Sequence, residues 1–299
     1  MKRLFIASLA LMVCILTHAQ LKVFPQMNVG DKYVYDCVTA SENPKIKLTA
    51  KSTIEFKVSE KTADGYIVDM LMTGLENDSK DNKISVLMDM TEGMIKDVKI
   101  RVVLDKNGKA QKIVNYNEVK KHCAAYIDRI VSMIYEEIPQ LEKTTPKAEM
   151  LNQAKSTLKE SILLDGITKT GTNPISIFGK TFTEGMVDSY VNSSKIKMKR
   201  TYHITGNTIT CNGVSNMTNE ETKEFILKKV EDSMPDKLES IKNSIDMLME
   251  SGLMNIEGTE DTVYKLLNNK WPKTINMNVN MKIMGQKITI NAQSTLRNF

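Results

Sequence analysis

Methionine is the residue type with the clearest capacity for unusual chemistry in this chain, with 20 copies in 299 residues. Thioethers bind soft metals such as copper(I), and Met277, Met281 and Met284 lie close enough in sequence to be considered as ligands. Met284 has the opposite strand parity to the other two, so a shared site would need a bulge. Flexible thioethers also fill apolar gaps and line adaptable binding walls. The pattern therefore favours an apolar role, and we expect no metal site.

Six methionines occupy the apolar side of segments in which apolar and polar residues alternate. They either fill a curved sheet beneath helices or line an apolar concavity that accepts lipid-like ligands. Both interpretations are open from the sequence, and the second gives a candidate ligand-binding face: Met70, Met72, Met88, Met90, Met277 and Met281.

Acid–base and nucleophilic catalysis has few candidates in this sequence. Beyond the N-terminal segment the only histidines are His122, on a predicted helix, and His203, on the polar side of a predicted strand. No HExxH, CxxC, GxSxG or Walker motif is present. Ser156 and Lys159 match the SxxK of penicillin-recognising enzymes, but a KTG follows within a handful of residues, much closer than in that family. We expect no catalytic residues and no cofactor, and an unidentified hydrolase is the third functional alternative.

The first 19 residues have the pattern of a secretory signal peptide. Lys2 and Arg3 precede an apolar stretch from Leu4 to Leu16, and Thr17-His18-Ala19 places small residues where a signal peptidase cleaves. We expect cleavage after Ala19, export, and no transmembrane span in the mature chain. Cleavage would remove two of 41 basic residues and none of the 36 acidic ones, leaving a formal charge of +3. That charge is too small to indicate nucleic-acid binding.

Three cysteines follow the predicted cleavage site: Cys37, Cys123 and Cys211. An odd number in an exported chain allows one disulfide with one thiol, or three thiols. Their spacing fits no zinc pattern.

Long alternating segments predict antiparallel strands. In residues 46–58 apolar positions alternate with lysine, threonine and glutamate, which is typical of a strand with one wet face. Residues from about 30 to about 114 read as a meander of such strands, with a turn at Asn107-Gly108. A two-residue loop at Gly206-Asn207 would place Ile204 opposite Ile209. A loop at Gly285-Gln286 would place Met281 opposite Ile290.

Helical periodicity appears in the remaining segments. Residues 117–138 carry an apolar stripe that runs from Val119 to Ile138, and Pro139 ends it. A second helix is predicted at 147–164 and ends at Gly166. Thr218 and Glu221 have capping-box spacing, so a third helical stretch starts there. It restarts at Ser233, Pro235 and Asp236 and ends at Gly252. The chain is therefore α+β, with long antiparallel β-strands forming one or two curved sheets and amphipathic helices packed on one face. We expect one domain, 20–299, with 20–165 and 166–299 as its sub-halves if it divides.

Four segments together resemble an uncharacterised family of exported, β-rich proteins from Gram-negative bacteria, a domain of unknown function. They are GDKY (30–33), TADGYIVDM (62–70), LDKNGKAQKIVN (104–115) and a Trp-Pro element before two long C-terminal strands. The resemblance covers most of the mature chain and implies a β-rich fold in the periplasm or on the cell surface. It transfers no active-site residue, because its motifs are turns and strand patterns. Many members are lipoproteins, whereas Val13 before Cys14 does not fit a lipobox.

The leading functional hypothesis is a non-enzymatic exported protein that binds an apolar or lipid-like molecule in a helix-covered groove of the sheet. The alternative is a structural or adhesive envelope protein, which would bind a partner protein through sheet edges or through the lysine-rich face of one strand. The candidate residues for that surface are Lys195, Lys197 and Lys199.

Overall fold

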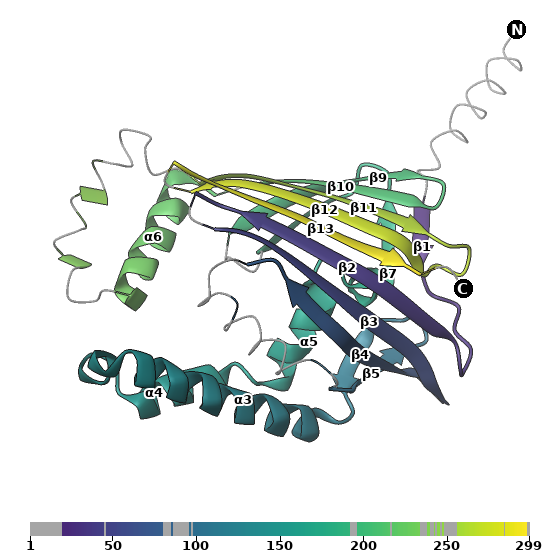
Figure 1. Ribbon diagram of the computed structural model, residues 1–299. Coiled ribbons are helices and arrows are strands. Elements are labelled where there is room, and N and C mark those ends of the chain that lie inside the picture. Colours follow the sequence, from purple (N-terminus) through teal and green to yellow (C-terminus); the bar gives the residue numbers. More distant parts are fainter. Residues whose placement is uncertain are drawn as a thin grey trace, which may run out of the picture.

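Eleven antiparallel strands form one large curved sheet (Figure 1). The computed structural model describes residues 20–44, 46–79, 98–191, 196–215, 217–233, 256–283 and 285–297, together with isolated positions at 85, 96 and between 238 and 247. The strands of the large sheet are β2 (Lys32–Glu42), β3 (Lys47–Thr62), β4 (Gly65–Asn77), β5 (Ile100–Asp105), β6 (Ala110–Ile113), β8 (Val187–Val191), β9 (Lys197–Thr205), β10 (Thr208–Ser215), β11 (Ile256–Leu266), β12 (Pro272–Ile283) and β13 (Gln286–Leu296).

The strand order joins the two ends of the chain at the centre of the sheet. The order is β6-β5-β4-β3-β2-β13-β12-β11-β10-β9-β8, so β2 pairs with β13. On one side of that pair the strands from β2 to β6 form the predicted meander. A separate two-stranded sheet joins β1 (Gln20–Val23) to β7 (Lys180–Thr183). The predicted class of long antiparallel strands with helices is confirmed.

Two-residue periodicity places one set of side chains on the face that packs against the helices, which we call the inner face. In β3, Phe56 and Val58 are fully buried while Lys57 between them is exposed. This agrees with the alternation predicted for residues 46–58, because successive strand residues point to opposite faces. The strand predicted from the methionine-rich segment 83–90 lies outside the described residues except at position 85, which is helical and so does not fit the prediction.

One of the two predicted hairpin registers is correct. Ile204 pairs with Ile209 across the β9–β10 turn, as expected. At the β12–β13 turn, however, Met281 pairs with Ile288 rather than Ile290. Ile283 pairs with Gln286, so Gln286 belongs to the strand and not to the loop, and Gly285 has φ of 75°, which glycine adopts without strain at a hairpin turn. The partners shift by two residues, so the inner face keeps its apolar residues.

Four α-helices are bounded in the described chain: α3 (Tyr116–Glu137), α4 (Lys147–Ser156), α5 (Glu160–Lys169) and α6 (Asn219–Ser233). Short 3₁₀ turns occur at η1 (Pro139–Lys143) and η2 (Pro174–Ile177). None of these helices has the length and apolarity that crossing a bilayer requires.

The buried stripe of α3 departs from the predicted one in its second half. Val119, Cys123 and Ile127 are buried as expected, but the stripe then continues through Val131 and Tyr135. The buried residues are therefore spaced four apart up to the end of the helix. Ile138, the last residue of the predicted apolar stripe, is 51% exposed.

The helix predicted at 147–164 is two helices. The chain leaves α4 at Thr157, whose hydroxyl donates to the Ala154 carbonyl at 2.6 Å, and restarts as α5 at Glu160. Gly166 does not end the second helix, which runs on to Lys169. The predicted start of α6 is correct: the Thr218 N–H donates to Glu221 Oε2 at 2.9 Å, and the Glu221 N–H donates to Thr218 Oγ1 at 3.2 Å. The predicted continuation toward Gly252 lies mostly outside the described residues.

The main core lies between the inner face and a layer made of α5, η2 and the β1–β7 sheet. Trp271 is fully buried at its centre and stacks on Tyr33 with ring centroids 3.8 Å apart. Phe178 and Phe56 meet the same indole edge-on. The sole tryptophan is therefore a core residue. A second cluster holds α3 against α4, so those two helices form an outer layer beneath α5 (Figure 1).

Candidate functional site

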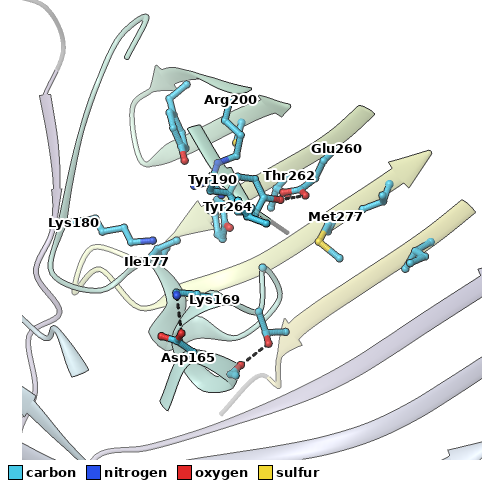
Figure 2. Close-up of a pocket in the computed structure, with 18 of the residues that line it drawn as sticks. Asp165, Lys169, Ile177, Lys180, Tyr190, Arg200, Glu260, Thr262, Tyr264 and Met277 are labelled. Carbon is cyan, nitrogen blue, oxygen red and sulfur yellow. Dashed lines mark hydrogen bonds and ion pairs between the residues drawn. The ribbon is translucent and has the colours of Figure 1, made fainter. Parts of the chain in front are cut away.

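A cavity of about 560 Å³ lies between α5 and the inner face of the β8–β13 half of the sheet (Figure 2). Its volume is within the range of small-molecule sites. The strands supply the floor, and α5, the turn after it, and β7 supply the opposite wall.

Strand register brings the floor residues together. On β11, Glu260, Thr262 and Tyr264 alternate with outward-facing residues and share the inner face. Thr262 pairs with Met277 of β12, and Glu260 pairs with Val279. Because antiparallel partners point to the same side of a sheet, these five side chains line one continuous surface.

The helical wall is one stripe of α5. Ile162, Asp165, Gly166 and Lys169 line the cavity at helical spacing. Lys169 Nζ lies 2.7 Å from Asp165 Oδ2, and both side chains are more than half exposed. Gly166 gives the cavity room, since a Cβ added there would meet nothing within 4 Å.

The turn after α5 closes over the methionines. A Cβ at Gly171 would come within 2.9 Å of Met277 Sδ, so only a glycine permits this approach without moving the thioether. The adjacent backbone is anchored on the sheet, where Ser294 Oγ donates to the Thr172 carbonyl at 2.8 Å.

One end of the cavity is a polar cluster built around Arg200 of β9. Its Nε and Nη2 donate to the two carboxylate oxygens of Asp188, each at 2.9 Å. The guanidinium lies 3.8 Å from the ring centroid of Tyr190, and Tyr202 Oη donates to the same aspartate at 3.0 Å. Desolvation opposes the charge of Arg200, but the hydrogen bonds to Asp188 hold its pKa above the usual value. The arginine is thus a fixed cation that already has its counter-ion.

A tyrosine–glutamate contact joins this cluster to the middle of the floor. Tyr190 Oη donates to Glu260 Oε2, and Glu260 is only 8% exposed. Burial, with the nearby Glu260 charge, raises the pKa of Tyr190 well above its usual value, so the phenol keeps its proton. Burial also raises the pKa of Cys211 to about 12. That thiol is therefore protonated at neutral pH and is a poor nucleophile.

Lys180 of β7 is a cavity cation that makes no direct ion pair or hydrogen bond within the described part of the chain, although the Asp188 charge acts on it from nearby. Its side chain is exposed, and Figure 2 shows its ammonium directed toward the middle of the cavity. Desolvation, and then the neighbouring charge of Arg200, lowers its pKa. The cavity therefore presents an accessible ammonium that can pair with an anionic group.

The other end of the cavity is apolar. Met277, Val279 and Met281 of β12 lie next to Ile290 of β13. At the boundary, the Thr262 hydroxyl is buried and has no hydrogen-bond partner within the described residues. The cavity is thus amphiphilic, with charges at one end and thioether and branched aliphatic side chains at the other.

No protein-family model matches this sequence, and neither does any curated protein. Two solved structures show weak similarity. A lipovitellin structure that describes lipid–protein interactions has a TM-score of 0.39 at 9% identity, and the match covers 89% of this chain but 25% of the lipovitellin chain. A porin-like protein from Bacteroides uniformis has a TM-score of 0.19 at 10% identity, covering 93% of this chain and 100% of that chain. Similarity at these TM-scores does not identify a ligand for this chain.

The structure separates the six candidate methionines. Met277 and Met281 line the cavity. Met70 and Met72 lie on β4 in the other half of the sheet, where Met70 packs against the main core and its sulfur lies 3.8 Å from Asn173 Nδ2. The candidates at positions 88 and 90, and Met284 of the considered copper site, lie outside the described residues. A ligand-binding role for any of them stays a prediction.

The predicted lysine surface is only partly described. Lys197 Nζ lies 2.9 Å from Glu221 Oε1 of α6, so it already has an ion-pair partner. Lys199 is exposed on β9. Position 195 lies outside the described residues, and partner binding by this surface stays a prediction.

Neither of the two histidines in the described residues lines the cavity. His203 Nδ1 lies 2.7 Å from Glu184 Oε1 on an exposed part of β9, and the His122 ring lies 5.0 Å from that of Tyr126 on α3. Cys37, Cys123 and Cys211 carry free thiols. Across the residues that the structure describes, no group of three histidine, cysteine, aspartate or glutamate side chains is placed to hold a metal ion.

The sequence interpretation missed the polar end of the cavity. Arg200 shares the inward parity of Met198 and Tyr202, and Glu260 has the parity of Thr262 and Tyr264. Both are charged residues at strand positions that otherwise hold apolar, inward-facing side chains. This pattern could have indicated the polar end from the sequence, because a buried charge requires a partner or a function. Nothing local marked Lys180, which reaches the cavity from a short strand in another sheet.

Proposed function

We propose that this chain is an exported, non-enzymatic envelope protein that binds an apolar or lipid-like ligand in the helix-covered groove of its sheet. The observation that supports the proposal is the two-ended cavity, with Met277, Val279, Met281 and Ile290 at one end and Arg200 at the other. Each methylene that a ligand buries there contributes about 0.8 kcal/mol, and the polar end leaves a place for a headgroup. Thioethers adapt their shape, which suits chains of variable length.

The location is part of the same proposal. The signal-peptide pattern of residues 1–19 and the resemblance to exported Gram-negative proteins both favour the periplasm or the cell surface. Free lipids must cross an aqueous space in either compartment, so a carrier with an enclosed apolar site has a physical use there.

The choice of a non-enzymatic function rests on the states of the cavity groups. The Cys211 thiol is held protonated by burial, and the Tyr190 hydroxyl is committed to Glu260. Neither group is prepared for attack on a ligand, since an active nucleophile needs an adjacent base or a lowered pKa.

The test is binding of an uncharged fluorescent probe, 1-aminoanthracene, to the mature protein and to two variants of one glycine. Gly166→Phe places a ring in the space above the floor, whereas Gly166→Ala changes the helix and leaves the space open. We expect the wild type and Gly166→Ala to bind the probe and Gly166→Phe to lose at least about tenfold in affinity. Binding that is equal in all three proteins, or absent from the wild type, would remove the cavity as the ligand site.

A further inference from the structure

The charges that line the cavity can be separated by how each is balanced. Arg200 and Asp188 form a bidentate pair, and Lys169 and Asp165 form another. Both pairs are electrically neutral, so neither pair favours a ligand of one charge over the other. Lys180 and Glu260 remain, and their opposite signs would favour opposite headgroups.

Accessibility decides between these two. Glu260 is 8% exposed and accepts the Tyr190 hydroxyl, so the floor already covers it. Lys180 is exposed to the cavity and has no hydrogen bond or ion pair with any described residue. A ligand that enters therefore meets the ammonium of Lys180 and not the carboxylate of Glu260. Figure 2 shows the two side chains well apart, on opposite sides of Tyr264.

The position of Lys180 also matches the geometry of an amphiphile. It lies at the end of the cavity away from Met277, with Tyr264 between them (Figure 2). A molecule with its polar group at Lys180 would cross Tyr264 and place its chain against Met277 and Met281. Thr262 also lines the cavity.

We propose that the cavity takes an amphiphile with an anionic headgroup, a carboxylate or a phosphate monoester, which pairs with Lys180 while the hydrocarbon chain lies toward Met277 and Met281. This inference rests on the proposed function and specifies its ligand class. An ammonium and an oxyanion form a charge-assisted hydrogen bond, which is stronger than a neutral one. The selectivity for charge therefore comes from one side chain, and the affinity for the chain comes from the apolar end.

The experiment is calorimetric titration with three ligands of the same chain length: dodecanoate and dodecyl phosphate below their micelle concentrations, and dodecanol below its solubility limit. The proteins are the wild type, Lys180→Met, and Lys282→Met as a matched control, because Lys282 is an exposed lysine on the opposite face of β12. We expect the wild type and Lys282→Met to bind at least one anion about tenfold more tightly than dodecanol. Lys180→Met should bind dodecanol as the wild type does and lose the preference. Which anion is preferred identifies the headgroup as a carboxylate or a phosphate.

Two results would overturn the inference in different ways. Equal binding of dodecanol and both anions by the wild type, or an anion preference that survives in Lys180→Met, would reject the role of Lys180 and keep the apolar site. No binding of any of the three ligands would reject the apolar site as well. A melting temperature for each variant shows that it is folded, so loss of preference cannot be confused with loss of structure.

Discussion

Thr262 of β11 pairs directly with Met277 of β12, and at this pair the polar end of the cavity meets the apolar end. The Thr262 hydroxyl is buried and has no hydrogen-bond partner among the described residues. The boundary of the site is therefore set by the register of two consecutive strands.

Thr262→Val removes that hydroxyl at nearly constant volume. A buried hydroxyl without a partner is unfavourable, so we expect the variant to be more stable than the wild type by about 1 kcal/mol. Urea denaturation of both ligand-free proteins measures the difference. Destabilisation by the same amount would mean that the hydroxyl has a partner in solution.

Asp188→Asn leaves the Arg200 guanidinium without its counter-ion. The Arg200 side chain is 19% exposed, so we expect a loss of about 2 kcal/mol in the free energy of unfolding. Asp165→Asn is the control, because it removes one partner of an exposed pair and should change stability by less than about 0.5 kcal/mol. Similar urea midpoints for the two variants would contradict the structural importance of the Arg200 pair.

Cys211 gives the protein a specific sensitivity to alkali. Burial raises its pKa to about 12 in the folded state, from 9.0 for an ordinary thiol. Between these values the unfolded chain releases the thiol proton and the folded chain keeps it, so stability falls as pH rises above about 9. Cys211→Ala lacks this thiol, so its free energy of unfolding should fall less steeply with pH over this range. The two slopes should differ by up to about 1.4 kcal/mol per pH unit. Parallel curves for the two proteins would place the Cys211 thiol in a more polar environment.

Trp271 should contribute to the stability of the core and not to ligand binding. It is fully buried between Tyr33 and Phe178, and it does not line the cavity. Trp271→Ala should therefore lower the free energy of unfolding by about 3–5 kcal/mol. Val187→Ala, at a side chain that is 52% exposed, should change it by less than about 0.5 kcal/mol. A tryptophan emission maximum typical of water in the wild type would contradict this placement.

Sequence periodicity predicted β3 and the β9–β10 hairpin because buried residues alternate with more exposed ones along part of each strand. The alternation at 46–58 gave the correct inner side of β3, and the turn at Gly206-Asn207 gave the correct partners for β9 and β10. The β12–β13 turn was predicted one position too far along the chain. Both the predicted and the observed register keep apolar residues opposite one another, so the alternation could not separate them. Periodicity fixes the face of a strand, whereas turn chemistry fixes its register.

The site was predictable only in part, for a physical reason. Met277 and Met281 could be named because they follow the apolar alternation of β12. Lys180 reaches the same cavity from the β1–β7 sheet, and α5 enters through a break after Thr157 that the helical period did not reveal. Contacts between separate layers depend on the tertiary arrangement, which no local pattern encodes.

Extraction of purified protein spanning residues 20–299 with organic solvent, followed by mass spectrometry, tests the central claim most directly. We predict that the wild type and Gly166→Ala release an amphiphilic molecule in near-stoichiometric amount, and that Gly166→Phe, expressed and purified in the same way, releases little or none. No co-purifying molecule from the wild type, or equal amounts from all three proteins, would contradict a ligand held between Gly166 and Met277.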